Sequence, residues 1–297
     1  MTKIGFNTNN LKKRALNMLF ILPLLIINIT FFVVPFIQSI YMSTFNWKLL
    51  GEKTFIFLDN YISVFQDTKF LSTLIFTGKY ALIATPFLFI TAFIMALLVN
   101  QSFKGVGIFR TIYFLPVVIS MSACSNIWLW IYNELYGVLN YILMGLNIID
   151  SPIAWMHKAS TSLPAVCLMV VWKMSGFTML MLLSAFQSID EEVYEASNID
   201  GASAVQRFGR ITLPLIRPTI GLSMVLSVIG SVLAFEQFKI MTSGGPSSST
   251  MTTVYYIYET SFGNFKFGYG SAMSLVLLLI LGILSFVQFA VMKDPTE

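Results

Sequence analysis

The sequence predicts an all-α, polytopic membrane protein with six transmembrane helices and a cytoplasmic helix-turn-helix loop between the fourth and the fifth of them. Composition is one reason: 56% of the 297 residues are hydrophobic, 11% are charged, and the mean hydropathy is +0.77. Water-soluble domains are far less apolar. Apolar runs of about 20 residues, the length that crosses a bilayer, also recur along the chain. A strongly polar run, 187–214, separates two of them.

The N-terminal segment is predicted to lie in the cytoplasm. Residues 1–14 carry Lys3, Lys12, Lys13 and Arg14 and no acidic residue, and such basic clusters stay on the cytoplasmic side. Residues 15–41 then form the first span. A cleavable signal peptide is the alternative, but the run exceeds the roughly 7–15 residues of a signal core, and no small-x-small cleavage site follows it.

The next two spans are predicted at 81–99 and 111–132. The segment 43–79 mixes charged and aromatic residues, which suits an external loop with interfacial elements. Residues 100–110 contain Lys104 and Arg110 but no acidic residue, so this loop is placed in the cytoplasm. The third span includes Pro116 and ends in an aromatic cluster typical of a membrane interface.

The last three spans are predicted at 163–186, 215–235 and 270–292. Residues 133–161 and 236–267 are external, and the loop 187–214 is cytoplasmic. The transmembrane domain thus runs over 15–292, with Lys293 just inside the membrane. Both chain termini are therefore expected in the cytoplasm.

The loop's local chemistry predicts two short helices and a turn. Ser188 and Glu191 have the spacing of a capping box, as do Ser203 and Gln206. Gly201 follows the first helix, and glycine accepts the positive φ that ends helices. Pro214 closes the loop as a first-turn residue of the fifth span. An ordinary surface loop is the alternative on these features alone.

The same loop resembles a motif of membrane permeases from bacterial ABC importers. Glu195-Ala196-Ser197, three residues, Gly201, nine residues and Ile211-x-Leu213-Pro214 match the pattern E-A-A-x3-G-x9-I-x-L-P, with Ser197 in place of the second alanine. The resemblance to sugar-importer permeases covers nearly the whole chain, and within that family the chain is similar to the first subunit of a permease pair. Further matching segments are 109–116, 198–202, 242–246 and 268–272.

The resemblance implies a subunit that moves a carbohydrate across the cell membrane, driven by ATP hydrolysis in separate subunits. Its implied partners are a second homologous permease, two cytoplasmic ATPases that use ATP and Mg, an extracytoplasmic solute-binding protein and the lipid bilayer. No G-x-x-x-x-G-K-[ST] loop occurs in this chain, so we expect no bound cofactor here. His157 stands alone, so neither catalysis nor a metal site is expected. The net charge of +4 reflects basic membrane flanks rather than nucleic-acid binding.

The resemblance also implies that the first loop helix docks in a cleft of an ATPase subunit. This would be a helix-in-groove contact in which Val193, Tyr194, Ala196 and Ile199 face the partner. Gly201 and Ala202 would allow the two short helices to turn. The expected coupling residues are Val193, Tyr194, Glu195, Ala196, Ser197, Asp200, Gly201, Ala202, Ile211, Leu213 and Pro214.

Polar residues inside the apolar runs mark the expected substrate path. Such groups are costly in hydrocarbon and usually face protein or a water-filled cavity. Each candidate has a structural alternative: Lys173 can snorkel or pair within the protein, the asparagines can bond a neighbouring helix, and the Glu-Gln pair can simply end the fifth span. The candidates are Asn126, Lys173, Glu236 and Gln237, with Asn28 as a further one.

Two other functions stay open at this point. The same type of importer can carry amino acids, peptides or a polyol phosphate, because a fold does not fix its ligand. A self-contained secondary transporter or channel is the second, and inverted repeats or intramembrane acidic chains would favour it. Neither is evident in the sequence, and that function would leave the 195–214 motif unexplained.

Overall fold

The computed structural model describes residues 20–101 and 103–292, which are mainly helical. It divides into two compact units, Met1–Gln66 with Thr260–Val276, and Asp67–Glu259 with Leu277–Glu297. In the described residues, five helices are long and apolar enough to cross a membrane, or six if one sharply bent pair counts as a single span. The predicted six-span, all-α fold class is therefore confirmed. The segments 1–14 and 15–19 lie outside the described residues.

The first unit holds the first span and a small cap. A helix runs over Phe20–Ser43 and includes the π-helical turn η1 (Ile29–Val33) and α2 (Val34–Ser43). Strand β1 (Phe45–Asn46) pairs antiparallel with β2 (Thr54–Phe55). Helix α3 (Asp59–Gln66) follows, and Asn60 Nδ2 donates to the carbonyls of Ser43 and Phe45 at 2.7 and 3.0 Å. The first turns of α14 (Phe267–Met292) also belong to this unit, preceded by the π-helical turn η3 (Glu259–Gly263).

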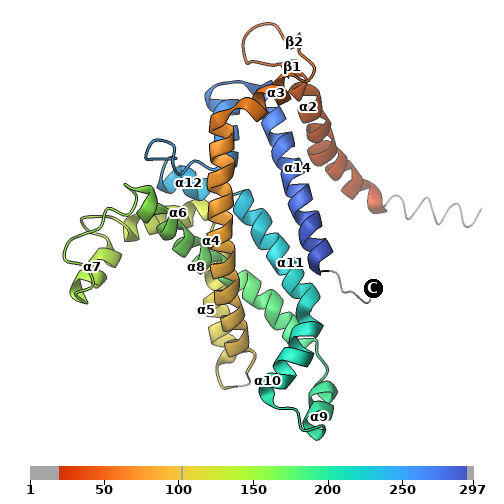
Figure 1. Ribbon diagram of the computed structural model, residues 1–297, viewed down its shortest axis with the longest axis vertical. Coiled ribbons are helices and arrows are strands. Elements are labelled where there is room, and N and C mark those ends of the chain that lie inside the picture. Colours follow the sequence, from red (N-terminus) through yellow and green to blue (C-terminus); the bar gives the residue numbers. More distant parts are fainter. Residues whose placement is uncertain (1–19, 102, 293–297) are drawn as a thin grey trace, which may run out of the picture. The chain divides into compact units, whose positions relative to one another are not determined.

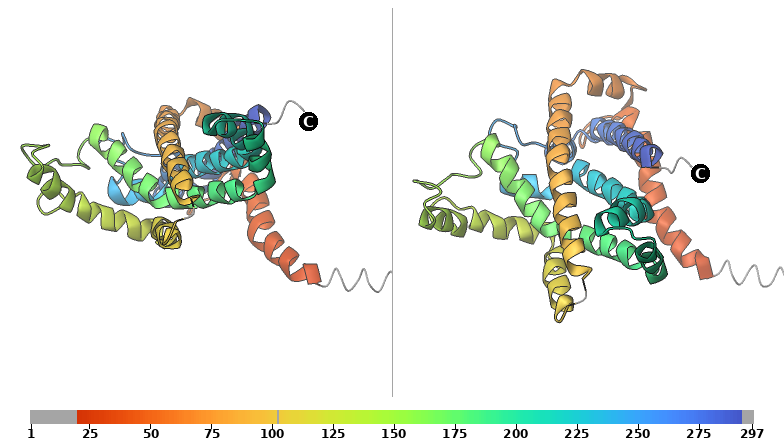
Figure 2. Two further views of the ribbon diagram at one scale, coloured as in Figure 1. Left: turned by 90° about the horizontal axis from the view of Figure 1, so that it is seen from below. Right: turned by 60° about the horizontal axis from the view of Figure 1, so that its bottom comes forward.

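The second unit is built on long helices (Figure 1). Its core contains α4 (Thr68–Val99), α8 (Ala159–Gln187) and α11 (Leu213–Val232), which pack against one another (Figure 2). Shorter elements connect them. These are α5 (Val106–Val118), α6 (Met121–Ile131), α7 (Val138–Gly145), α9 (Glu191–Ile199), α10 (Ala204–Arg207), the π-helical turn η2 (Phe208–Thr212), α12 (Glu236–Met241) and α13 (Thr253–Tyr258).

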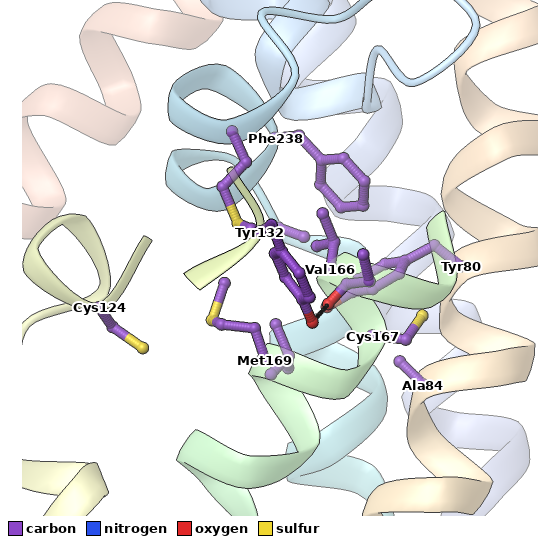
Figure 3. Packing of buried hydrophobic residues seen from close by; sticks show 12 residues of the cluster. Tyr80, Ala84, Cys124, Tyr132, Val166, Cys167, Met169 and Phe238 are labelled. Atoms are coloured by element: carbon purple, nitrogen blue, oxygen red, sulfur yellow. Dashed lines mark hydrogen bonds between the residues drawn. The ribbon is translucent and has the colours of Figure 1, made fainter. Parts of the chain in front are cut away.

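A cluster of buried side chains joins α4, α6, α8 and α12 (Figure 3). The Tyr80 ring stacks edge-on against Phe238, with ring centroids 4.9 Å apart. Tyr132 donates its hydroxyl to the Ala165 carbonyl at 2.9 Å, which satisfies the one polar atom that its ring carries into the core. Cys124 and Cys167 are buried in the same cluster as free thiols.

The second span is longer than predicted. It begins at Thr68 rather than at Ala81, because Asp67 caps α4 by accepting from the N–H groups of Lys69 and Phe70 at 2.9 and 3.1 Å. The prediction of a loop over 43–79 is therefore wrong beyond Gln66. Lys69 and Lys79 lower the hydropathy of the first part of α4, so hydropathy alone did not indicate where the helix begins.

The third span is broken, whereas the sequence predicted a continuous one over 111–132. Helices α5 and α6 meet at an angle of 100°. Ile119 has the extended φ and ψ of −69° and 136°. Ser120 then caps α6 by accepting from Ala123 N–H at 3.2 Å. A serine cap in the middle of an apolar run starts a new helix.

The fifth span does not begin at Pro214 or Leu215. Helix α10, η2 and α11 follow one another without a gap from Ala204 to Val232, so the second loop helix and the span are continuous. Pro214 lacks the N–H that an α-helix would use, and a π-helical turn just before it absorbs the mismatch. The predicted spans 163–186 and 270–292 lie inside α8 and α14.

Candidate functional site: the 187–214 loop and the polar span residues

The first loop helix, α9 (Glu191–Ile199), does not begin at its predicted cap, Ser188. Ser188 Oγ donates to the Ala185 carbonyl at 2.8 Å and so belongs to the end of α8. The residue before α9 is Asp190, whose side chain makes no cap hydrogen bond. The predicted capping box from Ser188 to Glu191 is therefore wrong, although Glu191 and Glu192 do occupy the first turn, where the helix dipole favours acidic groups.

The turn and the second cap agree with the sequence prediction. Helix α9 ends at Ile199, and Gly201 adopts a φ of +72°. The Ser203 hydroxyl accepts from Gln206 N–H at 3.3 Å, while the Gln206 side chain accepts from Ser203 N–H at 2.9 Å. This reciprocal pair is a complete capping box.

One side of α9 is fastened to the following helical run. The Tyr194 hydroxyl lies 3.1 Å from Thr212 Oγ1 in η2, and Arg207 of α10 donates to the side-chain oxygen of Asn198. Ser197 is buried on the same side and donates to the Tyr194 carbonyl at 2.7 Å. Tyr194 is half-buried. Its side chain therefore contacts its own chain, unlike the outward orientation predicted for it.

The other side of α9 is exposed and carries apolar side chains together with the acidic Glu192 and Glu195. Val193 is 38% exposed and Ile199 is 87% exposed, and Ala196 lies between them with the three-residue spacing of one helix face. Val205 on α10, in the same loop, is 81% exposed. Among the other predicted coupling residues, Glu195, Asp200 and Pro214 are exposed, and Ala202, Ile211 and Leu213 are half-buried.

An aromatic chain connects the loop to the core helices. The Phe208 ring of η2 lies 6.1 Å from that of Phe93 on α4. Phe93 in turn lies 5.9 Å from Phe186, at the end of α8. These edge contacts place η2 against α4, which in turn packs on α8, at the end of the unit where α9 and α10 lie (Figure 1).

Lys173 is buried beneath the bend of the third span. Its Nζ donates to the carbonyls of Pro116 and Val117 at 3.3 and 3.2 Å and to that of Ile119. These carbonyls lie where α5 ends and its helical hydrogen bonds run out, although that of Pro116 also accepts from Ile119 N–H at 3.3 Å. The lysine side chain, only 4% exposed, thus closes the end of another helix.

Asn126 and Glu236 come together around a residue that the sequence analysis missed. Ser122 donates its hydroxyl to Glu236 Oε2 at 2.8 Å, and its carbonyl accepts from Asn126 Nδ2 at 2.9 Å. Asn126 and Glu236 are exposed and Ser122 is half-buried, so an amide, a carboxylate and a hydroxyl meet at the surface between α6 and α12. The four-residue spacing of Ser122 and Asn126 on a helix could have indicated it.

Gln237 points the other way from Glu236, into the protein. It is 4% exposed, and its Nε2 lies 3.5 Å from the Tyr80 hydroxyl. Gln237 and Tyr80 line a cavity of about 220 Å³, and its wall also carries hydroxyl groups from α8 and α11. Asn28 belongs to the first unit and donates to the Leu24 carbonyl at 3.1 Å. The cavity hydroxyls are those of Thr178, Ser223, Ser227 and Ser231.

The apolar spans and the inserted loop define a multi-pass membrane transport component. The chain belongs to the family described as binding-protein-dependent transport system inner membrane component, which matches residues 62–295. It is a membrane component of a transport system and not an enzyme. Among the described residues, no group of three or more His, Cys, Asp or Glu could hold a metal ion.

Individual relatives agree with this family. The chain is 31% identical over 282 residues to the probable ABC transporter permease protein YurN of Bacillus subtilis (strain 168), covering 94% of this chain and 96% of the relative. It is also 31% identical over 282 residues to the trehalose/maltose transport system permease protein MalF of Thermococcus litoralis, covering 94% of each. A crystal structure of a bacterial ABC transporter involved in the import of the acidic polysaccharide alginate contains a chain with the same fold, at a TM-score of 0.84 and 21% identity, covering 97% of this chain and 99% of that one.

Proposed function

We propose that the chain is a permease subunit of an ABC importer that carries a carbohydrate across the cell membrane, driven by ATP hydrolysis in separate subunits. The observation that carries this proposal is the exposed side of α9, which presents Val193 and Ile199, while the other side is bonded to Thr212 of η2. The names of relatives support the cargo class: one is a trehalose/maltose permease, and the lactose permease LacF of Rhizobium radiobacter is 30% identical over 280 residues.

The proposed complex contains further chains. Two cytoplasmic ATPase subunits use ATP and Mg, and α9 docks on one of them by inserting Val193, Ala196 and Ile199 into a groove. A second, homologous permease completes the pathway, of which this chain is the first subunit. An extracytoplasmic solute-binding protein docks on the segments 133–161 and 236–267. In this arrangement both termini and the 187–214 loop are cytoplasmic, consistent with the basic residues of 1–14 and 100–110.

Movement of α9 would reach the membrane helices as a rigid-body motion. The Tyr194–Thr212 and Arg207–Asn198 contacts join α9 to a helical run that continues from Ala204 to Val232. Phe208 contacts Phe93 on α4 in addition. Closure of the ATPase subunits would therefore displace α4, α8 and α11 together rather than bend the loop alone.

The proposed substrate path includes the open surface around Ser122 and the cavity beside Gln237. Sugar hydroxyls both donate and accept, and the carboxylate of Glu236, the amides of Asn126 and Gln237 and the Tyr80 hydroxyl meet both needs. Lys173 serves this path by supporting the bend from which α6 begins, because its three hydrogen bonds all go to backbone carbonyls there.

The test is the ATPase activity of the reconstituted complex, prepared with co-purifying partners and a binding protein loaded with different sugars. We expect one sugar to stimulate hydrolysis and a Gly201→Val variant to abolish the coupling of hydrolysis to uptake, since valine is strained at a φ of +72°. If no ATPase co-purifies and liposomes containing this chain alone move solute, a secondary transporter is the correct function instead.

A further inference from the structure

A basic, hydroxyl-rich hollow lies beside the first half of α4. Its volume is about 610 Å³, and its walls are one face of α4 and the loop 247–249. The two lysines, Lys69 and Lys79, stand roughly 15 Å apart along the helix axis. Four serine hydroxyls line the space between them, those of Ser72, Ser247, Ser248 and Ser249.

The lining of the hollow is basic. None of its lining residues is acidic, and both lysine side chains are exposed. Asp67, the nearest acid in sequence, accepts from two backbone N–H groups of α4 and from the Tyr256 hydroxyl. Lys69 Nζ lies 5.2 Å from the Tyr256 ring centroid, a contact that leaves its charge unneutralised. The hollow therefore favours an anionic group.

Lys79 lies in the first half of the long apolar helix α4. It follows the start of α4 by roughly 16 Å along the axis, and near a membrane boundary a lysine costs free energy unless it reaches water, a polar cavity or a counter-charge. No ion pair with Lys79 forms within residues 20–101 and 103–292. A negative ligand in the hollow would remove this cost.

An apolar groove adjoins the basic hollow around the same helix. Its volume is about 350 Å³, and Ile75 lines both spaces. The groove has one polar side chain, Thr77, whose hydroxyl is already bonded to the Thr73 carbonyl at 2.8 Å. The other lining residues are Leu74 and Gly78 of α4, Val232 of α11, and Leu277, Ile280 and Leu284 of α14.

We propose that the hollow and the groove together bind one anionic phospholipid. The phosphate would lie between Lys69 and Lys79 with serine hydroxyls donating to its oxygens, and one acyl chain would lie in the groove past Ile75. Basic pockets between membrane helices are suited to anionic headgroups. The adjoining groove favours a lipid over an acidic side chain of a protein partner, because a side chain would leave the apolar space unfilled.

The two halves of the site can be removed separately. Lys69→Gln with Lys79→Gln removes the charge, and Lys48→Gln, an exposed lysine outside both spaces and outside the proposed docking segments, is its control. Gly78→Leu fills the groove, because a Cβ at Gly78 meets no atom within 4 Å. Gly282→Leu is the matched control: its Cβ site is equally open, and it does not line the groove.

The measurement is lipid retention by the full-length protein with its co-purifying partners, followed by native mass spectrometry in phosphatidylglycerol or phosphatidylcholine. We expect the wild type to prefer phosphatidylglycerol by about tenfold or more, since each lysine adds to headgroup affinity. The double lysine variant should lose this preference. Gly78→Leu should weaken retention of phosphatidylglycerol severalfold, and both controls should behave as the wild type.

Glycerol phosphate distinguishes a lipid from a free anion. We expect it not to displace bound phosphatidylglycerol at equal concentration, because it cannot occupy the groove. Equal displacement would overturn the acyl-chain half of the proposal. An unchanged lipid preference in the double lysine variant would overturn the whole. So would loss of binding-protein docking in that variant with normal lipid retention, since the hollow would then receive an acidic protein partner.

Discussion

The role of Lys173 is decided at the scale of single atoms. Replacement by methionine roughly keeps the length of the side chain but removes a donor from three backbone carbonyls at the bend, of which only that of Pro116 keeps another donor, Ile119 N–H. Buried acceptors without partners are costly, so we expect Lys173→Met to lower the free energy of unfolding by roughly 2–4 kcal/mol. Thermal unfolding of the purified protein in detergent measures this effect.

The exposed Lys158 supplies the comparison. Lys158→Met should leave the unfolding temperature unchanged, because no side-chain partner of Lys158 occurs among the described residues. If Lys173→Met unfolds like the wild type yet transports no sugar, the lysine acts on substrate rather than on the bend.

Gly176 permits the close approach of α8 to α5. A Cβ at this position would lie 2.1 Å from the Tyr113 carbonyl oxygen, a backbone atom that cannot rotate away. We expect Gly176→Ala to destabilise the protein by about 1–3 kcal/mol. Gly107→Ala is the control, because its Cβ would meet no atom within 4 Å. Equal unfolding temperatures for the two variants would show that the helices separate at little cost.

Sequence reasoning found the polar residues of the spans but not their contacts. Lys173 and the carbonyls that it binds are more than fifty residues apart in the chain, and periodicity reports only neighbours three or four positions away. The same limit explains why Ser122 was missed, since its link to Glu236 crosses from α6 to α12.

At the scale of elements, local chemistry predicted the turn and the second cap of the loop correctly, but not the first cap, because Ser188 ends α8 instead of starting α9. The Gly201 turn and the Ser203–Gln206 capping box depend on adjacent residues, and both agree with the prediction. The bend between α5 and α6 does not, because hydropathy stays high through Ile119 and Ser120. The continuity of α10 with α11 was also missed, since Pro214 is as compatible with a π-helical turn as with a helix start.

Helix α9 should transmit force through its side-chain contacts with the next helical run. Tyr194→Phe combined with Asn198→Ala removes the contacts to Thr212 and Arg207 while keeping the exposed Val193 and Ile199. We therefore expect docking and ATP hydrolysis to persist and sugar uptake per ATP to fall severalfold. Parallel assays of hydrolysis and uptake in proteoliposomes measure the ratio.

The control for that pair keeps α9 attached and changes its free face. Ile199→Glu introduces charge at a position that is 87% exposed, so folding should be unaffected while binding of the ATPase subunit weakens. An unchanged uptake-to-hydrolysis ratio in the double variant would mean that α9 moves independently of α11.

At the scale of the whole molecule, the length of the apolar runs predicts the spans. Only the distribution of charged residues predicts how the chain is oriented in the membrane. Length and hydropathy predicted six spans, and the described residues contain five long apolar helices and one bent pair that can form the sixth. The charge argument depends on Lys104 and Arg110 in one short loop and on the basic residues of 1–14. Arg110 also donates to the Val99 carbonyl at 2.8 Å. Its guanidinium group therefore also bonds the last residue of α4.

Cysteine labelling distinguishes the two orientations. The native Cys124 and Cys167 are buried, so background labelling by a membrane-impermeant maleimide should be low. Leu135 is 89% exposed and Ile199 is 87% exposed, and the proposed topology places them on opposite sides. We expect Leu135→Cys to react in intact cells and Ile199→Cys to react only in inside-out vesicles. The reverse pattern would put the α9 face outside the cell, where no ATPase could reach it, and the proposed coupling would be wrong.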